Sequence, residues 1–141
     1  MLDKALAVIV VTAAGALLAY LRWKFYDRSK QHAAAANVAL GIQRRFPDEV
    51  AGFVWRSISL EKLGCTQDAY ENLEPVVDKF DGLGIVPYLL AVYAAELQQV
   101  RLTWKWLARS FATPDGKELK KRSLEEKSLE AFWRDIGEWS E

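Results

Sequence analysis

Few residues of this chain could carry out chemistry. It has one histidine, His32, and one cysteine, Cys65, far apart in the sequence. A zinc site built from imidazole and thiolate could draw on only one of each, fewer than a structural site needs. A Cys–His nucleophilic pair remains an alternative in principle, but Cys65 follows Gly64 in a segment typical of a turn. We therefore interpret Cys65 as a turn residue and expect no metal site and no nucleophile.

The other clusters of polar residues are typical of surfaces. The segment Gly82–Gly84 follows an expected helix and not a strand, so it lacks the context of a phosphate-binding loop. Acidic side chains near the C-terminus share a helical face with lysines, which is typical of a solvated surface: Glu125, Glu126 and Glu130. A short basic cluster precedes them, and solvation is also its default interpretation: Lys117, Lys120, Lys121 and Arg122. The sequence therefore predicts no catalytic residues, no cofactor and no enzyme activity.

Charge and length narrow the class of protein further. Lysine plus arginine and aspartate plus glutamate number 19 each among 141 residues, so no net positive field would attract nucleic acid. A single cysteine excludes an internal disulfide framework. The length is that of one modest domain.

A regular period runs through the chain. One constant shift takes Ala35 to Ala69 and Ala69 to Thr103, and four other pairs of similar residues follow it: Ile42 and Val76, Phe46 and Phe80, Leu63 and Leu97, Leu73 and Leu107. We call this shift the repeat period. Ala39 departs from the pattern, because the later copies have leucine at that place. Repeats of this length, about 34 residues, are typical of helix–turn–helix units that bury their apolar faces by stacking.

The chain after residue 28 is predicted to be helical throughout. Apolar residues recur there at spacings of three and four residues, and no stretch alternates between apolar and polar residues. Proline and glycine mark the breaks between helices. The expected helices are 29–45, 47–63, 66–80, 85–98, 102–111, 117–127 and 129–139.

Residues 30–112 resemble the tetratricopeptide repeat (TPR) family. The first unit, 50–83, has Ser57 and Ala69 at the family's small positions and Gly64 in the turn. The second unit, 84–117, has Ala91 at a small position but Gln98 in place of the turn glycine and Thr103 in place of alanine. The resemblance implies an all-α protein, a short α-solenoid of antiparallel helix pairs. Helix 31–47 is interpreted as an N-terminal cap and residues 118–141 as a C-terminal cap, so that the TPR-like domain spans 31–141.

The resemblance also implies a groove for a protein partner. In the family, the first helix of each unit lines the concave face, which here gives Val54, Ile58, Glu61, Lys62, Ile85, Tyr88 and Val92. Five of these form what we call the apolar strip: Val54, Ile58, Ile85, Tyr88 and Val92. A helix or extended peptide with apolar anchors would fit such a strip. In the alternative interpretation, the N-terminal or C-terminal helices of the chain itself fill the groove.

The N-terminal segment has the composition of a membrane anchor. Residues 5–21 carry no charge, and as a helix they would be about 25 Å long. Lys4 and Arg22 flank the segment, and aromatic residues follow it, as at a membrane interface. We predict a single transmembrane helix within residues 1–30; a buried core helix and a cleaved signal peptide are the alternatives.

Basic residues after the predicted span place the C-terminal domain in the cytoplasm by the positive-inside rule: Arg22, Lys24, Arg28 and Lys30. The predicted function is that of a membrane-tethered adaptor or scaffold that binds a protein partner and contacts the lipid bilayer through residues 5–21. The alternative is a structural accessory subunit that is permanently buried in a larger membrane complex.

Overall fold

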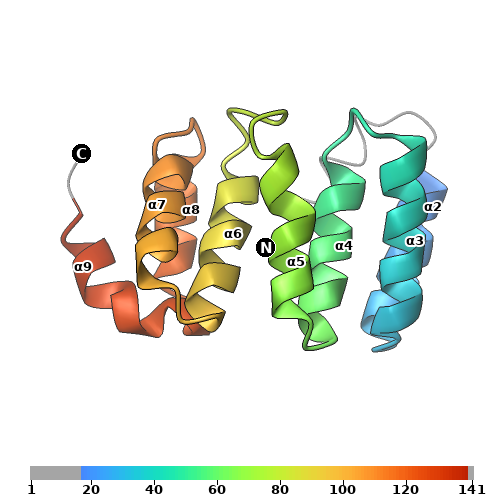
Figure 1. Ribbon diagram of the computed structural model, residues 1–141, viewed down its shortest axis with the longest axis horizontal. Coiled ribbons are helices and arrows are strands. Elements are labelled where there is room, and N and C mark those ends of the chain that lie inside the picture. The colour runs from blue at the N-terminus through green and yellow to red at the C-terminus, as the bar shows by residue number, and fades with distance from the viewer. Residues whose placement is uncertain (1–16, 140–141) are drawn as a thin grey trace. The chain divides into compact units, whose positions relative to one another are not determined.

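The structure, a computed structural model, describes residues 17–139. All of its elements over these residues are helices, which confirms the all-α class for this part of the chain. In chain order they are α2 (Leu17–Arg28), α3 (His32–Arg45), α4 (Ala51–Lys62), α5 (Thr66–Leu73), the 3-10 helix η1 (Glu74–Val76), α6 (Ile85–Glu96), α7 (Val100–Phe111), α8 (Gly116–Ser123), the 3-10 helix η2 (Lys127–Phe132) and α9 (Trp133–Gly137) (Figure 1).

The chain divides into two compact units. Unit 1 ends at Leu73 and holds α2 to α5, and unit 2 begins at Glu74 and holds the remaining helices. The boundary falls inside the repeat that the sequence predicts over 50–83. In unit 1, α3 packs on both α2 and α4, and α4 packs on α5. In unit 2, α6 and α7 form the main antiparallel pair, and η2 lies against α6.

In each of three helical hairpins, the first helix ends in the same type of turn, and the three turns lie one repeat period apart. Lys30, Gly64 and Gln98 all have left-handed backbone angles, with φ of 57°, 82° and 60°. In each turn the following residue donates its backbone N–H to a carbonyl in the last turn of the first helix: Gln31 to Tyr26 at 2.9 Å, Cys65 to Leu60 at 2.9 Å and Gln99 to Ala94 at 2.8 Å. This pattern is the Schellman motif. The repeat period is therefore also a period of backbone geometry.

The first of these hairpins changes the interpretation of the N-terminal half. The sequence assigns helix 31–47 to a cap that follows a membrane span, whereas α3 is the second helix of a hairpin whose first helix is α2. Figure 1 shows α2 lying behind α3. We assign α2 and α3 to one hairpin because the turn between them, at Lys30, has the same geometry as the turns at Gly64 and Gln98.

The predicted membrane-spanning helix is corrected by the structure. Among residues 17–139, no helix is both long enough and apolar enough to cross a bilayer. Positions 5–16 of the predicted span lie outside the described residues, and Leu17–Leu21 belong to α2, a helix of 12 residues that also carries charged side chains. Its Trp23 is only 1% exposed and packs within unit 1. This finding overturns the prediction of a single-pass membrane protein and the cytoplasmic placement that depends on it.

Several helix ends differ from the prediction. The helix expected over 66–80 ends at Leu73 and is followed by η1. Pro75 accounts for this end, because proline lacks the N–H and its ring clashes with the preceding turn. The two long helices expected over 117–139 are three short elements, α8, η2 and α9.

Close helix contacts in each unit depend on glycines. In unit 1, a Cβ on Gly52 of α4 would lie 2.7 Å from the Cα of Gln43 on α3, so only glycine fits there. In unit 2, a Cβ on Gly84 would meet Leu119 at 2.5 Å, and the Ser110 hydroxyl donates to the Gly84 carbonyl at 2.9 Å. These contacts position the helices that carry the residues discussed next.

Candidate interaction site in the first hairpin

The residues of the apolar strip are buried in both units. In unit 1, Val54 and Ile58 of α4 are 0% and 8% exposed. In unit 2, Ile85, Tyr88 and Val92 of α6 are all buried as well. These five side chains are therefore not a free surface, and their role in binding a partner stays a prediction.

The two charged residues predicted beside Val54 and Ile58 remain accessible. Glu61 is half-buried and Lys62 is exposed. The Lys62 ammonium donates to Asp27 at 2.6 Å, which links the end of α4 to the end of α2. Asp27 also lies 3.9 Å from His32, the only histidine.

Tyr88 shows how the C-terminal segment covers α6 within unit 2. Burial raises the pKa of the Tyr88 hydroxyl above its ordinary value, and the nearby Glu126 carboxylate adds to this effect. The next residues along the chain also contact α6, because Ser128 of η2 donates to Glu96 at 2.8 Å. This arrangement corresponds to the alternative in which helices of the chain itself cover the predicted groove.

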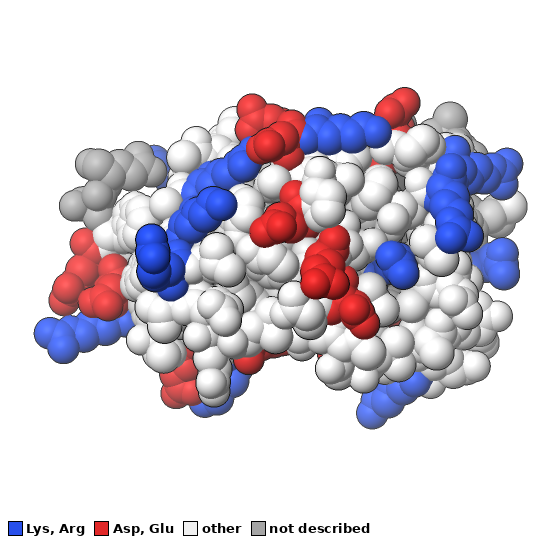
Figure 2. Space-filling model, in the orientation of Figure 1, with Lys and Arg blue, Asp and Glu red and all other residues white. Residues whose placement is uncertain are grey.

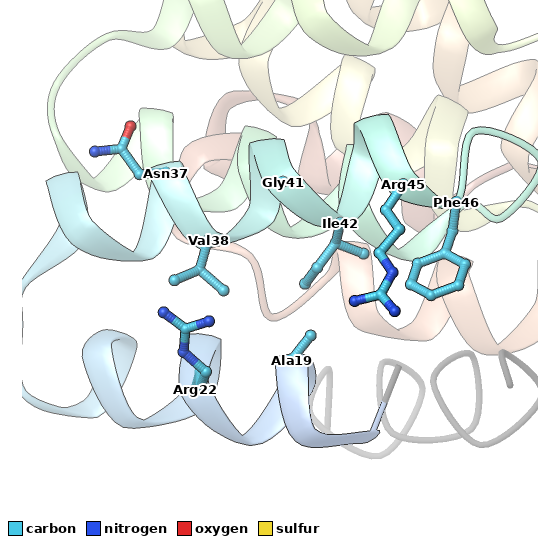
Figure 3. A pocket seen from close by; sticks show the side chains of 8 residues that line it. All are labelled: Ala19, Arg22, Asn37, Val38, Gly41, Ile42, Arg45 and Phe46. Carbon is cyan, nitrogen blue, oxygen red and sulfur yellow. The ribbon is translucent and has the colours of Figure 1, made fainter. Parts of the chain in front are cut away.

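A groove between α2 and α3 is an open site among the described residues of unit 1. Its volume is about 400 Å³, and we call it the α2–α3 groove (Figure 3). It is lined by Ala19 and Arg22 from α2 and by Asn37, Val38, Gly41, Ile42, Arg45 and Phe46 from α3 and its C-terminal end. Figure 3 shows the Arg22 side chain extending toward Val38 on α3, and the Arg45 side chain extending toward α2.

The groove is open because two of its lining residues are small. Ala19 presents only a methyl group on the α2 side. On the α3 side, a Cβ on Gly41 would find nothing within 4 Å. The floor is apolar through Val38, Ile42 and Phe46, which are half-buried or buried. An apolar side chain of a partner could enter this space without displacing any atom of residues 17–139.

The groove is also electropositive. The hairpin from residue 17 to 45 carries Asp27 as its single carboxylate, already paired with Lys62, against six cations: Arg22, Lys24, Arg28, Lys30, Arg44 and Arg45. Among residues 17–139, no carboxylate forms an ion pair with Arg22 or Arg45. The Arg45 guanidinium lies over the Phe46 ring, 5.4 Å from its centroid. Figure 2 shows basic side chains over α3 on the face in view.

Unit 2 has a second pocket, of about 710 Å³, at its C-terminal end. It is lined by Ala108, Phe111, Ala112, Thr113, Pro114, Lys117 and Trp139. The Trp139 ring stacks on Trp104, with centroids 5.8 Å apart and planes 18° apart, and meets Phe111 edge to face. Trp139 is therefore anchored in the aromatic packing of unit 2, and Lys117 is the only charged residue of the lining.

Arg22, Gly41 and Arg45 are not among the site residues predicted from the sequence. Arg22 has the pattern of a membrane boundary, and Ile42 and Phe46 that of repeat positions. A signal for the groove is nevertheless present in the repeat period, which aligns Val38 with Asn72. The Asn72 amide hydrogen-bonds across the second hairpin, whereas the Val38 side chain has no polar atom.

Groups with catalytic or metal-binding chemistry do not gather at the groove. Among residues 17–139, no cluster of three or more histidine, cysteine, aspartate or glutamate side chains could hold a metal ion. Cys65 is half-buried in the turn between α4 and α5. The fold and the groove together define a helical-hairpin protein with a basic, partly apolar surface site.

Comparison with protein families, with curated proteins and with solved structures finds no match for this chain. The resemblance to the TPR family therefore stays a prediction from the sequence.

Proposed function

We propose that this protein is a non-enzymatic interaction module that docks a protein partner in the α2–α3 groove. The observation that carries the proposal is the combination of an apolar floor with two guanidinium groups, Arg22 and Arg45, that no carboxylate of residues 17–139 pairs. An apolar pocket that can take an anchoring side chain, edged by arginine, has the composition of an interaction hot spot.

The outer face of α2 supports the proposal. Leu18 and Phe25 are 75% and 61% exposed. Leu18 lies one helical turn before Arg22, so its side chain is next to the groove on the same helix. An exposed apolar surface beside an open groove is typical of a site that another molecule covers. The resemblance to TPR proteins, whose stacked helices bind other proteins, is a second support.

A photo-crosslinking experiment on the full chain tests the proposal. A photoreactive amino acid replaces Asn37 at the rim of the groove, and a matched variant carries it at Glu71, which is one repeat period later and also exposed. We expect saturable crosslinks to a partner protein from position 37 that are lost when Gly41→Trp fills the groove. Equal crosslinking from positions 37 and 71, or crosslinks that survive Gly41→Trp, would contradict docking at this site.

A structural accessory subunit is the second candidate function. It is favoured by the exposed apolar residues of α2, since Leu18, Leu21 and Phe25 would all be covered in a permanent complex. Stoichiometric copurification that survives a salt wash would support this candidate. Reversible, salt-sensitive binding would support the adaptor.

A further inference from the structure

In the second hairpin, an arginine and an asparagine link the two helices, α4 and α5, by hydrogen bonds. Arg56 of α4 donates through Nη1 to the Asn72 side-chain oxygen of α5 at 2.8 Å. Asn72 in turn donates through Nδ2 to the Phe53 carbonyl of α4 at 2.9 Å. The amide thus accepts a hydrogen bond from the guanidinium and joins the two helices of the hairpin.

The first hairpin keeps the arginine of this arrangement but not the asparagine. Arg22, Val38 and Ala19 stand one repeat period before Arg56, Asn72 and Phe53. All three line the α2–α3 groove. The Val38 side chain has no hydrogen-bond acceptor, and among residues 17–139 no group accepts a hydrogen bond from the Arg22 side chain. The guanidinium therefore presents its donors to the groove.

We propose that the α2–α3 groove recognises a carboxylate of an acidic partner peptide, bound by Arg22 where Asn72 binds Arg56 in the second hairpin. This inference rests on the proposed function and gives the chemistry of its partner. A carboxylate accepts two parallel N–H donors from one guanidinium, so it is a stronger acceptor than the amide it replaces. Arg45, on the other side of the groove, takes a second acidic group, and the apolar floor takes an aliphatic or aromatic side chain between them.

Charge on the rest of the hairpin favours an acidic guest. Six cations and one paired carboxylate over residues 17–45 leave a positive field at this site, although the whole chain is neutral. Such a field raises the association rate of acidic peptides and makes it depend on ionic strength. No carboxylate of residues 17–139 competes with the guest for Arg22 or Arg45.

The test is selection of a phage-displayed library of random twelve-residue peptides on the immobilised full-length protein. We expect the enriched peptides to carry aspartate or glutamate together with a large apolar residue. Synthetic copies should lose about ten-fold or more in affinity for Arg22→Gln, which removes a charged hydrogen bond. Val38→Asn should also weaken binding, because it supplies Arg22 with the internal partner that Asn72 gives to Arg56. Arg28→Gln is the control: it makes the same change of charge on an exposed residue of α2 outside the groove.

The outcomes separate the inference from the function on which it rests. Peptides without acidic residues that bind wild type and Arg22→Gln equally, and are blocked by Gly41→Trp, would overturn the inference and leave the docking function standing. Equal losses from Arg22→Gln and Arg28→Gln would overturn it too, because binding would then follow net charge alone. If no peptide is enriched, both the function and the inference fail. A lipid headgroup would be the ligand, and the inference would be overturned, if two results were found together. These are cosedimentation of the protein with phosphatidylserine vesicles that is abolished by Arg22→Gln, and an absence of acidic peptides among the binders.

Discussion

The indole rings of Trp23 and Trp55 stack in unit 1, with centroids 5.3 Å apart and planes 16° apart. Trp23 lies on α2 and Trp55 on α4, so the stack joins α2 to the second hairpin. The Trp23 Nε1–H also donates to the Ser59 hydroxyl at 2.9 Å. This contact makes α2 part of the core of unit 1, and it is the basis of the first prediction.

Trp23→Ala should destabilise the protein by about 3–5 kcal/mol, because it removes a fully buried aromatic side chain and leaves a cavity. Phe25→Ala on the same helix is the control. Its ring is 61% exposed, so we expect a change within about 0.5 kcal/mol. Urea unfolding followed by circular dichroism measures both, and similar losses for the two variants would contradict the packing of α2 described above.

Two glycines should respond to alanine in opposite directions. Gly52→Ala should destabilise by about 1–3 kcal/mol, since its Cβ would overlap the backbone of Gln43. Gly41→Ala should stabilise by up to about 1 kcal/mol, because the space is open and alanine favours the helix. Thermal unfolding of the two variants and of the wild type measures both changes in stability. A loss of stability in Gly41→Ala would mean that the groove is filled.

The left-handed turns at Lys30 and Gln98 should gain from glycine. A residue with a Cβ pays roughly 1–2 kcal/mol in this conformation, and the greater freedom of glycine in the unfolded chain offsets part of the gain. We expect Lys30→Gly and Gln98→Gly each to raise the free energy of unfolding by roughly 0.5–1 kcal/mol. Gly64→Ala, at the equivalent turn, should lower it. A neutral result at all three positions would indicate that the turns relax without the Schellman geometry.

Tyr88 should make the protein less stable at alkaline pH. Burial raises its pKa in the folded state, so the unfolded chain loses the phenolic proton first as the pH rises above about 10. The unfolded state then binds fewer protons than the folded state, and the free energy of unfolding falls by up to about 1.4 kcal/mol per pH unit from this group. Denaturant unfolding between pH 9 and 11, about one unit either side of the ordinary pKa, should show a smaller decline for Tyr88→Phe than for wild type. Parallel curves would mean that Tyr88 ionises as freely in the folded state as in the unfolded one.

The helical class and the repeat period follow from the sequence alone, since both are local properties of residue type and spacing. The repeat also extends to the first hairpin, because Lys30 lies one repeat period before Gly64 and has the same turn geometry. The end of α5 is not predicted in this way: the apolar pattern around Leu73 and Val76 favours a helix that runs through Pro75, whereas α5 ends at Leu73.

Which apolar faces are covered depends on how the helices pack, and the sequence does not show it. On α2, Trp23 packs on Trp55 in the core of unit 1, whereas Leu18 and Leu21 of the uncharged run stay exposed, and composition alone does not separate these two faces. Val54 and Tyr88 have the spacing of a groove but are buried by neighbouring segments of the chain. The α2–α3 groove exists because Gly41 and Ala19 leave space that no other described side chain fills, and that depends on how two helices meet in space.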